Sequence, residues 1–178
     1  ETFADIVAEY NAGVSEEKQV PFQIYYDFGY GLSYTDFSVE IVDYELPAEL
    51  PSTENDLQIS VTAKVTNIGD TAGKNVVELY YGAPDGVLEN PSMELVAFAK
   101  TDELQPGQSQ EVKITFDVYD MADWYEEEAA YILMGGEYNL YIGDSLDGAK
   151  ENRVVYTLDA GDYTVGREGS NLAGPDQE

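Results

Sequence analysis

Short runs in which apolar and polar residues alternate one by one are the feature that most constrains the fold of this chain. The clearest run spans residues 57–66. Its apolar positions are Leu57, Ile59, Val61, Ala63 and Val65, and the positions between them are polar. Because successive side chains of a β-strand point to opposite faces, such a run buries one face and exposes the other to water. The run therefore predicts a strand with one buried face.

Six further runs of this kind are separated by turn-forming residues such as the pair Pro106 and Gly107. They predict strands at residues 37–46, 77–81, 95–100, 111–118, 137–143 and 152–158. Many short strands with frequent turn signals are typical of an all-β sandwich. We therefore predict a seven-stranded β-sandwich. In its penultimate strand, the hydroxyl of Tyr138 is expected to bond nearby backbone, as in a tyrosine corner.

The remaining segments suggest how the chain is organised. We expect an irregular lead-in from a preceding domain at residues 1–36, the sandwich at 37–160 and a tail or linker at 161–178. Within the lead-in, residues 5–10 can form a short helix. Residues 120–130 are too acidic and alternate too poorly for a strand, so we predict a helical turn or crossover there. Since the chain begins without Met, we expect it to be a piece of a longer protein.

A large excess of negative charge excludes several classes of partner. Among 178 residues there are 36 acidic and 8 basic side chains, which gives a formal net charge of -28. Nucleic acids and anionic membranes would be repelled, so neither is expected as a partner. The chain also contains no His and no Cys. It therefore lacks the commonest proton shuttle at neutral pH, thiol nucleophiles and the usual zinc ligands, and we expect no cofactor.

The most specific motif lies at residues 26–37, which read Tyr-Asp-Phe-Gly-Tyr-Gly-Leu-Ser-Tyr-Thr-Asp-Phe. This stretch resembles the Pro-Phe-Gly-(Tyr or His)-Gly-Leu-Ser-Tyr-Thr-x-Phe signature of family-three glycoside hydrolases of the β-glucosidase type. In that family the signature leads into the C-terminal fibronectin type III-like domain. Asp27 stands where the family has Pro, and this exchange touches no chemistry.

Four more stretches are similar to motifs of the same family and follow in the family's order. They are residues 65–80, 94–100, 104–109 and 136–138. The first contains Val-Thr-Asn-x-Gly-x-x-Ala-Gly-x-x-Val-Val-x-Leu-Tyr, and the third contains Leu-x-Pro-Gly-x-Ser. In the second, Ala97 replaces a usual Gly. Together the five motifs cover most of the chain.

The resemblance implies a fold of the fibronectin type III or immunoglobulin-like kind and a structural role. In the family, a barrel and an α/β sandwich carry the nucleophile and the acid/base of a retaining mechanism, so no catalytic residue is assigned to this chain. The expected partners are those other domains. The parent enzyme would hydrolyse terminal β-linked glucose or xylose. Two alternatives stay open: an independent carbohydrate-binding module, and an adhesive or interaction domain of a surface protein.

The aromatic and glycine-rich part of the lead-in is the candidate for an interdomain seam. Its residues are Tyr25, Tyr26, Phe28, Gly29, Tyr30, Gly31, Leu32 and Tyr34. Tyrosine rings with polar tips suit an interface that is apolar at its centre and wet at its rim. The alternative is that these rings plug one end of the sandwich. We favour the seam, because a stretch this rich in aromatics exceeds the needs of one small core.

Carboxylate pairs could in principle act on glycosidic bonds or bind calcium. Asp120 with Asp123 and Asp144 with Asp147 are such pairs, but both lie in turn-like segments where solvated surface charge is the default. Asp144 and Asp147, or residues 85–89, are weak calcium candidates, and we assign no metal site.

Carbohydrate is a possible partner through ring stacking. Trp124 and Tyr125, which lie beside acidic residues, are the best candidates for weak sugar contact. The competing interpretation, which we favour, is that Trp124 caps the core of the sandwich.

Overall fold

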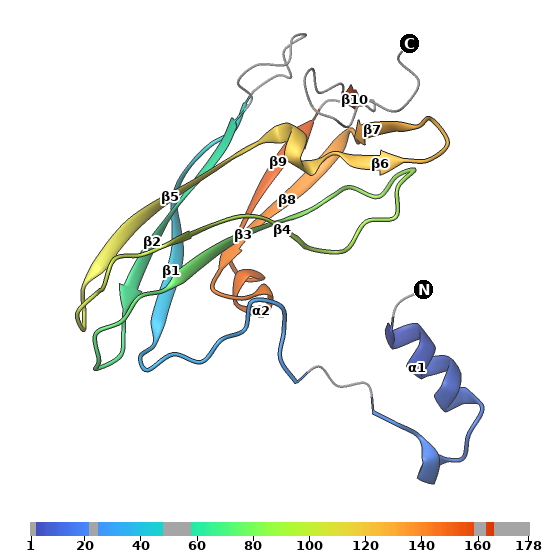
Figure 1. The fold of residues 1–178 in the computed structure, drawn as a ribbon, viewed down its shortest axis with the longest axis horizontal. Helices are drawn as coiled ribbons and strands as arrows, with labels where there is room; N and C mark the ends of the chain where they lie inside the picture. The colour runs from blue at the N-terminus through green and yellow to red at the C-terminus, as the bar shows by residue number, and fades with distance from the viewer. Residues whose placement is uncertain (1–2, 22–24, 48–57, 159–162, 166–178) are drawn as a thin grey trace.

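Two antiparallel sheets form the body of the molecule (Figure 1). A computed structural model describes residues 3–21, 25–47, 58–158 and 163–165. The first sheet has the order β1-β2-β5, with β1 at Phe37–Glu45, β2 at Gln58–Asn67 and β5 at Ser109–Asp117. The second has the order β4-β3-β8-β9, with β4 at Glu94–Lys100, β3 at Val76–Gly82, β8 at Gly136–Gly143 and β9 at Arg153–Leu158. These strands correspond to the seven predicted runs, so the predicted β-sandwich is confirmed.

The core lies between the two sheets and is built from the apolar positions of the alternating runs. In β2, the side chains of Ile59, Val61 and Val65 are fully buried, and those of Val77 and Leu79 in β3 are as well. Leu57, the first apolar residue of the clearest run, lies outside the described residues. β2 is the central strand of its sheet, and its partner β5 buries Val112, Ile114 and Phe116 in the same alternating way.

The predicted hydrogen bond of Tyr138 is confirmed. Its ring is fully buried, and its hydroxyl donates to the backbone oxygen of Met134 at 2.9 Å. The bond spans the turn that leads into β8 and satisfies a polar atom that burial would otherwise make costly.

A third, small sheet was not predicted. Its order is β10-β7-β6, with β6 at Asp123–Tyr125, β7 at Ala130–Leu133 and β10 at Tyr163–Val165. A helical turn does precede it, the 3-10 helix η2 at Val118–Met121. The rest of the predicted crossover is instead a β-hairpin, so that part of the prediction is wrong. Acidic residues of this segment form the hairpin loop. Its strands are too short for an alternation of apolar and polar residues to be recognised in the sequence.

The N-terminal segment is predicted to contain a short helix, and α1 at Phe3–Ala12 confirms it. In Figure 1, α1 and the 3-10 helix η1 at Glu16–Lys18 lie away from the two sheets, while a short helix α2 at Leu146–Ala149 lies at the end of β8 beside the lead-in. No helix in the described ranges has the length and apolar character that crossing a membrane requires. That residues 1–36 connect to a preceding domain stays a prediction.

Candidate interdomain surface

A tight turn brings the lead-in against the sandwich. The backbone N–H of Tyr30 donates to the oxygen of Asp27 at 3.1 Å, and Gly29 at the third position of this turn has φ 79°. A positive φ at that position is the requirement of a type II turn, which glycine meets without strain. The glycine of the family-like motif is therefore explained by local backbone geometry.

The turn rests on the outer face of the second sheet. Because Val77, Leu79 and Tyr81 point into the core, Glu78 and Tyr80 of β3 point outward. Tyr80 is nevertheless fully buried. The ring of Phe28 meets the ring of Tyr80 edge-on, with centroids 6.4 Å apart and planes at 80°. The lead-in therefore covers a part of the sheet that alternation alone would leave in water.

A second segment of the chain holds the same turn. The backbone N–H of Leu146, the first residue of α2, donates to the oxygen of Phe28 at 2.9 Å. The short helix packs closely on β8, since a Cβ at Gly143 would lie 2.5 Å from the backbone nitrogen of Ala149. The turn is thus held by a backbone hydrogen bond as well as by ring contact.

Further along, the lead-in is held again where it enters β1. Thr35 is 7 % exposed, and its hydroxyl donates to the side-chain oxygen of Asn67 at 2.8 Å. The backbone oxygen of Asp36 accepts from the N–H of Ile68 at 2.8 Å and of Gly69 at 3.2 Å. Asn67 itself is fully buried and donates to the backbone oxygen of Leu104 at 2.8 Å. Both ends of the segment 27–36 are therefore attached to the sandwich.

Between and beside these two attachments, apolar side chains face water. Leu32 is 92 % exposed and Tyr34 96 %, and Tyr25 and Tyr26 are also largely exposed. The rings of Tyr26 and Tyr30 lie 5.0 Å apart and shield each other only in part. The rings therefore do not plug the sandwich, so that alternative is wrong. We call the set Tyr25, Tyr26, Phe28, Tyr30, Leu32 and Tyr34 the aromatic strip.

One exposed ring beside the aromatic strip was missed by the sequence reasoning. Phe98 of β4 pairs across the sheet with Glu78 and is 70 % exposed, so the apolar surface continues from the turn onto the sheet. Its outward position in an alternating strand was visible in the sequence. What the sequence did not reveal is that the lead-in lies on the same face.

The charges around the turn favour a neutral phenol at Tyr80. Burial raises the pKa of Tyr80 well above its usual range, and the adjacent Glu78, which accepts the hydrogen bond of the Tyr80 hydroxyl, raises it further. The carboxylates of Asp144 and Asp27 act in the same direction at longer range. Tyr80 therefore stays a hydrogen-bond donor over the physiological pH range.

The sugar candidates Trp124 and Tyr125 lie on β6 of the small sheet. Trp124 is 44 % exposed and meets the ring of Tyr131 edge-on at 5.3 Å, so the prediction that it caps the core is wrong. Tyr125 donates its hydroxyl to Glu127 at 2.8 Å. The two residues are adjacent in a strand and point to opposite faces, so they do not form one stacking platform.

The candidate carboxylates have local structural partners. Asp120 accepts from the backbone N–H of Asp117 in the capping box of η2, and Asp147 forms an ion pair with Lys150 at 2.8 Å. Asp144 contributes to the negative field around Tyr80. Burial, and then the nearby Glu94, raise the pKa of Asp123. Across the described ranges, no three acidic, His or Cys side chains are grouped so that they could hold a metal ion.

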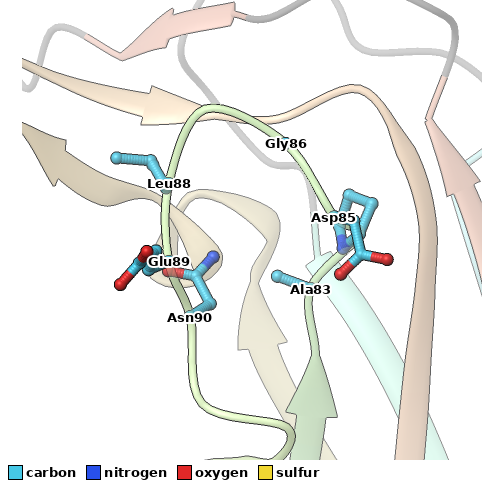
Figure 2. A pocket seen from close by; sticks show the side chains of 7 residues that line it. Ala83, Asp85, Gly86, Leu88, Glu89 and Asn90 are labelled. Carbon is cyan, nitrogen blue, oxygen red and sulfur yellow. The ribbon is translucent and has the colours of Figure 1, made fainter. Parts of the chain in front are cut away.

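A small polar pocket lies in the loop between β3 and β4 (Figure 2). It has a volume of about 300 Å³, and Asp85 and Glu89 stand on opposite arms of the loop that lines it. None of its lining residues is aromatic, and Trp124 is not among them. The pocket therefore offers no ring on which a sugar could stack, and it does not extend the case for carbohydrate made by Trp124 and Tyr125.

Comparison with known proteins gives a consistent picture. Residues 75–146 match the model of the fibronectin type III-like domain family. The chain is 40 % identical over 149 residues to beta-glucosidase A of Butyrivibrio fibrisolvens, which covers 76 % of this chain and 18 % of that protein. It is 38 % identical over 141 residues to beta-glucosidase B of Emericella nidulans, covering 79 % of this chain and 16 % of the relative.

Solved structures agree with these sequences. Beta-glucosidase 3B of Thermotoga neapolitana matches 80 % of this chain with a TM-score of 0.67 and 30 % identity, over 18 % of its own length. Beta-glucosidase of Kluyveromyces marxianus matches 80 % of this chain with a TM-score of 0.70 and 28 % identity, over 16 % of its length. The chain thus spans less than a fifth of the relatives it matches.

Proposed function

Because this chain contains a fibronectin type III-like domain of family-three β-glucosidases, we propose that it is a non-catalytic accessory domain that braces the other domains of such an enzyme. In this proposal residues 1–36 come from a preceding domain, residues 37–160 form the brace, and residues 161–178 are a tail or linker. The chain's own task is to hold its neighbours in a fixed arrangement.

The aromatic strip is the observation that carries the proposal. Leu32 and Tyr34 are almost fully exposed although the backbone on both sides of them is attached to the sandwich. Exposed apolar surface of this extent on an ordered segment marks an interaction site. The relatives are five to six times longer than the matched region, so further domains are available to cover the strip.

The partners in this proposal are domains of the same protein, a barrel and an α/β sandwich, rather than nucleic acid or membrane. The full-length protein hydrolyses terminal β-linked glucose or xylose by a retaining mechanism, and both catalytic carboxylates lie on those domains. The names of the relatives, which are all beta-glucosidases, support glucose as the sugar. The chain contributes no group to the bond-breaking step and needs no cofactor.

The direct test is binding of the chain to recombinant barrel and α/β domains of its parent, measured by calorimetry. We expect saturable binding that a double variant, Leu32→Ser with Tyr34→Ser, weakens by roughly tenfold or more, since both side chains lose apolar contact. Val87→Ser is the matched control, because Val87 is 56 % exposed in the pocket loop, outside the strip. An equal loss of affinity in both variants, or no binding by the unsubstituted chain, would refute the proposal.

Catalysis by the chain itself is tested separately with an aryl β-glucoside. The proposal expects no turnover above the uncatalysed rate. Sustained turnover that follows the chain through purification would place catalytic carboxylates here and overturn the accessory role.

Carbohydrate binding is a second candidate, favoured by the partly exposed ring of Trp124. The test is simple because Trp124 is the only tryptophan in the chain. Titration with cello-oligosaccharides while following its fluorescence would give a saturable change for a carbohydrate-binding module and none for a brace. An adhesive domain of a surface protein would bind neither the sugars nor the parent's domains.

A further inference from the structure

The outer face of β3 holds the lead-in more specifically than an ordinary surface contact would. Tyr80 projects from this face and is still fully buried, because Phe28 and Gly29 of the lead-in lie over it. Its hydroxyl donates to the carboxylate of Glu78, two residues earlier on the same face. Gly143 opposes Glu78 on β8, and the space that a Cβ at Gly143 would need is filled by the backbone of α2 at Gly148 and Ala149.

Gly29 approaches these two side chains so closely that any larger residue would force them to move. A Cβ at this position would overlap the Glu78 carboxylate and would lie 2.8 Å from the Tyr80 hydroxyl. The backbone there also has φ 79°, which side-chain-bearing residues rarely adopt. Turn geometry and close approach therefore both favour glycine, for independent reasons.

We propose that Glu78 and Tyr80 are positioning residues that form a latch, which holds the turn 27–30 on the sheet and sets the direction in which the aromatic strip faces. The Phe28 ring packs on Tyr80, the Gly29 backbone lies on the Glu78–Tyr80 hydrogen bond, and Leu146 holds the Phe28 carbonyl. Neither residue contributes to the core, because the core side of β3 is made by the residues between and beside them.

The latch gives the lead-in two faces. One face contacts the sandwich through Phe28 and Gly29. The other presents Leu32 and Tyr34 to the other domains of the enzyme. This consequence rests on the proposed function, but the latch itself does not, because it is a property of this chain alone. Without the latch, the lead-in would let the preceding domain rotate relative to the sandwich. With the latch, the lead-in fixes the angle between these two domains.

The test compares two glycines of the same motif in the intact chain. Gly29→Ala introduces a Cβ into the latch, whereas a Cβ at Gly31 meets nothing within 4 Å, so Gly31→Ala is the matched control. The readout is amide hydrogen exchange by NMR at Tyr30, which donates to Asp27, and at Leu146, which donates to Phe28.

We expect Gly29→Ala to accelerate exchange at both amides by roughly tenfold or more, the factor set by forcing a side-chain-bearing residue into the left-handed region. Gly31→Ala should leave both rates unchanged. Equal effects of the two substitutions, or no effect of Gly29→Ala, would overturn the latch.

Two further variants separate the latch from the turn. Tyr80→Phe keeps the ring against Phe28 but removes the hydroxyl, and should accelerate exchange by roughly fivefold. Glu78→Gln keeps an acceptor for the hydroxyl and should have a smaller effect. If Gly29→Ala accelerates exchange while Tyr80→Phe does not, the turn alone anchors the lead-in and the proposal fails.

Failure of the latch and failure of the bracing function give different results. A latch is seen in the isolated chain, whereas bracing is seen only when the parent's other domains are added. If the substitutions change amide exchange as predicted but the chain does not bind those domains, bracing alone is refuted. If the chain binds those domains but the substitutions do not change amide exchange as predicted, the latch alone is refuted.

Discussion

Two pairs of aromatic rings in this molecule have similar geometry and opposite surroundings. In the sandwich, Tyr81 and Tyr138 lie 6.4 Å apart with tilted planes, and both are buried. In the lead-in, Tyr26 and Tyr30 lie 5.0 Å apart with tilted planes, and both are about half exposed or more. The contact between rings is therefore not what distinguishes a core from a surface. The difference is whether a second layer of side chains excludes water.

The sandwich supplies that second layer from its own two sheets, so it can be stable alone. The lead-in receives one layer, the outer face of β3, and has nothing on its other side in the described part of the chain. Because a segment attached at both ends has already lost most of its conformational freedom, a partner that covers it pays little further ordering entropy. The sandwich is thus packed on both sides by its own residues, whereas the lead-in is packed on one side and leaves the other free for a partner.

The largest expected effect comes from two leucines at opposite extremes. Leu79 is fully buried in the core and Leu32 is 92 % exposed in the strip. We expect Leu79→Ala to lower the free energy of unfolding by about 2–5 kcal/mol, and Leu32→Ala to change it by less than about 0.5 kcal/mol. Urea unfolding followed by far-UV circular dichroism measures both. A loss of several kcal/mol in Leu32→Ala would abolish the distinction between the two regions.

A smaller effect is expected from two tyrosine hydroxyls. Tyr138→Phe removes the buried donor to the Met134 carbonyl and should cost about 1–2 kcal/mol, because that oxygen is left without its partner. Tyr34→Phe is the matched change in the strip and should cost nothing measurable, since Tyr34 is 96 % exposed. Thermal unfolding under identical conditions compares them, and equal shifts would contradict the structure.

How far the sequence leads can be judged from β2 and β3. The period-two pattern correctly predicted that Ile59, Val61 and Leu79 face the core, because strand geometry forces alternate residues to one side. The same pattern assigned Glu78 and Tyr80 to water. Alternation describes only the strand's own backbone, and here the outer face is covered by residues about fifty positions earlier in the chain.

The small sheet shows a different limit. Its strands β6 and β7 are three and four residues long, too short for a period to be seen, and their pairing places Trp124 against Tyr131. The family-like motif, by contrast, identifies the lead-in from the sequence alone. It marked Gly29 and Thr35, but their contacts with Glu78 and Asn67 became visible only in three dimensions.

The boundary between the two regions can be probed by alkaline pH. The pKa of Tyr80 is raised by burial and by Glu78, so the folded state keeps its proton where the unfolded chain loses it. The protonated Tyr80 therefore makes its full contribution to the free energy of unfolding below the unfolded pKa of about 10. This contribution is lost as the pH rises above that value. We expect Tyr80→Phe to make the decline of stability in that range shallower, while Tyr81, whose pKa is also raised by burial, keeps part of it.

Urea unfolding at a series of alkaline pH values measures this difference. Tyr34→Phe is again the control, and the decline should persist in it. A decline of the same steepness in Tyr80→Phe would mean that Tyr80 is not the group responsible, and would place it with the exposed rings rather than at the junction.

The smallest effect extends the comparison from rings to carboxylates. The pKa of Asp123 is raised by burial and by Glu94, so its charged form is disfavoured in the folded state. Asp123→Asn should therefore stabilise the chain at neutral pH by about 0.5 kcal/mol, while Asp85→Asn, at an exposed loop position, should not. The gain should vanish as the pH falls through the raised folded pKa towards about 4, where the wild-type carboxyl also becomes neutral. Urea midpoints at neutral and acidic pH compare the variants, and a gain that persists in acid would show that shape or hydrogen bonding, rather than charge, makes Asp123 costly.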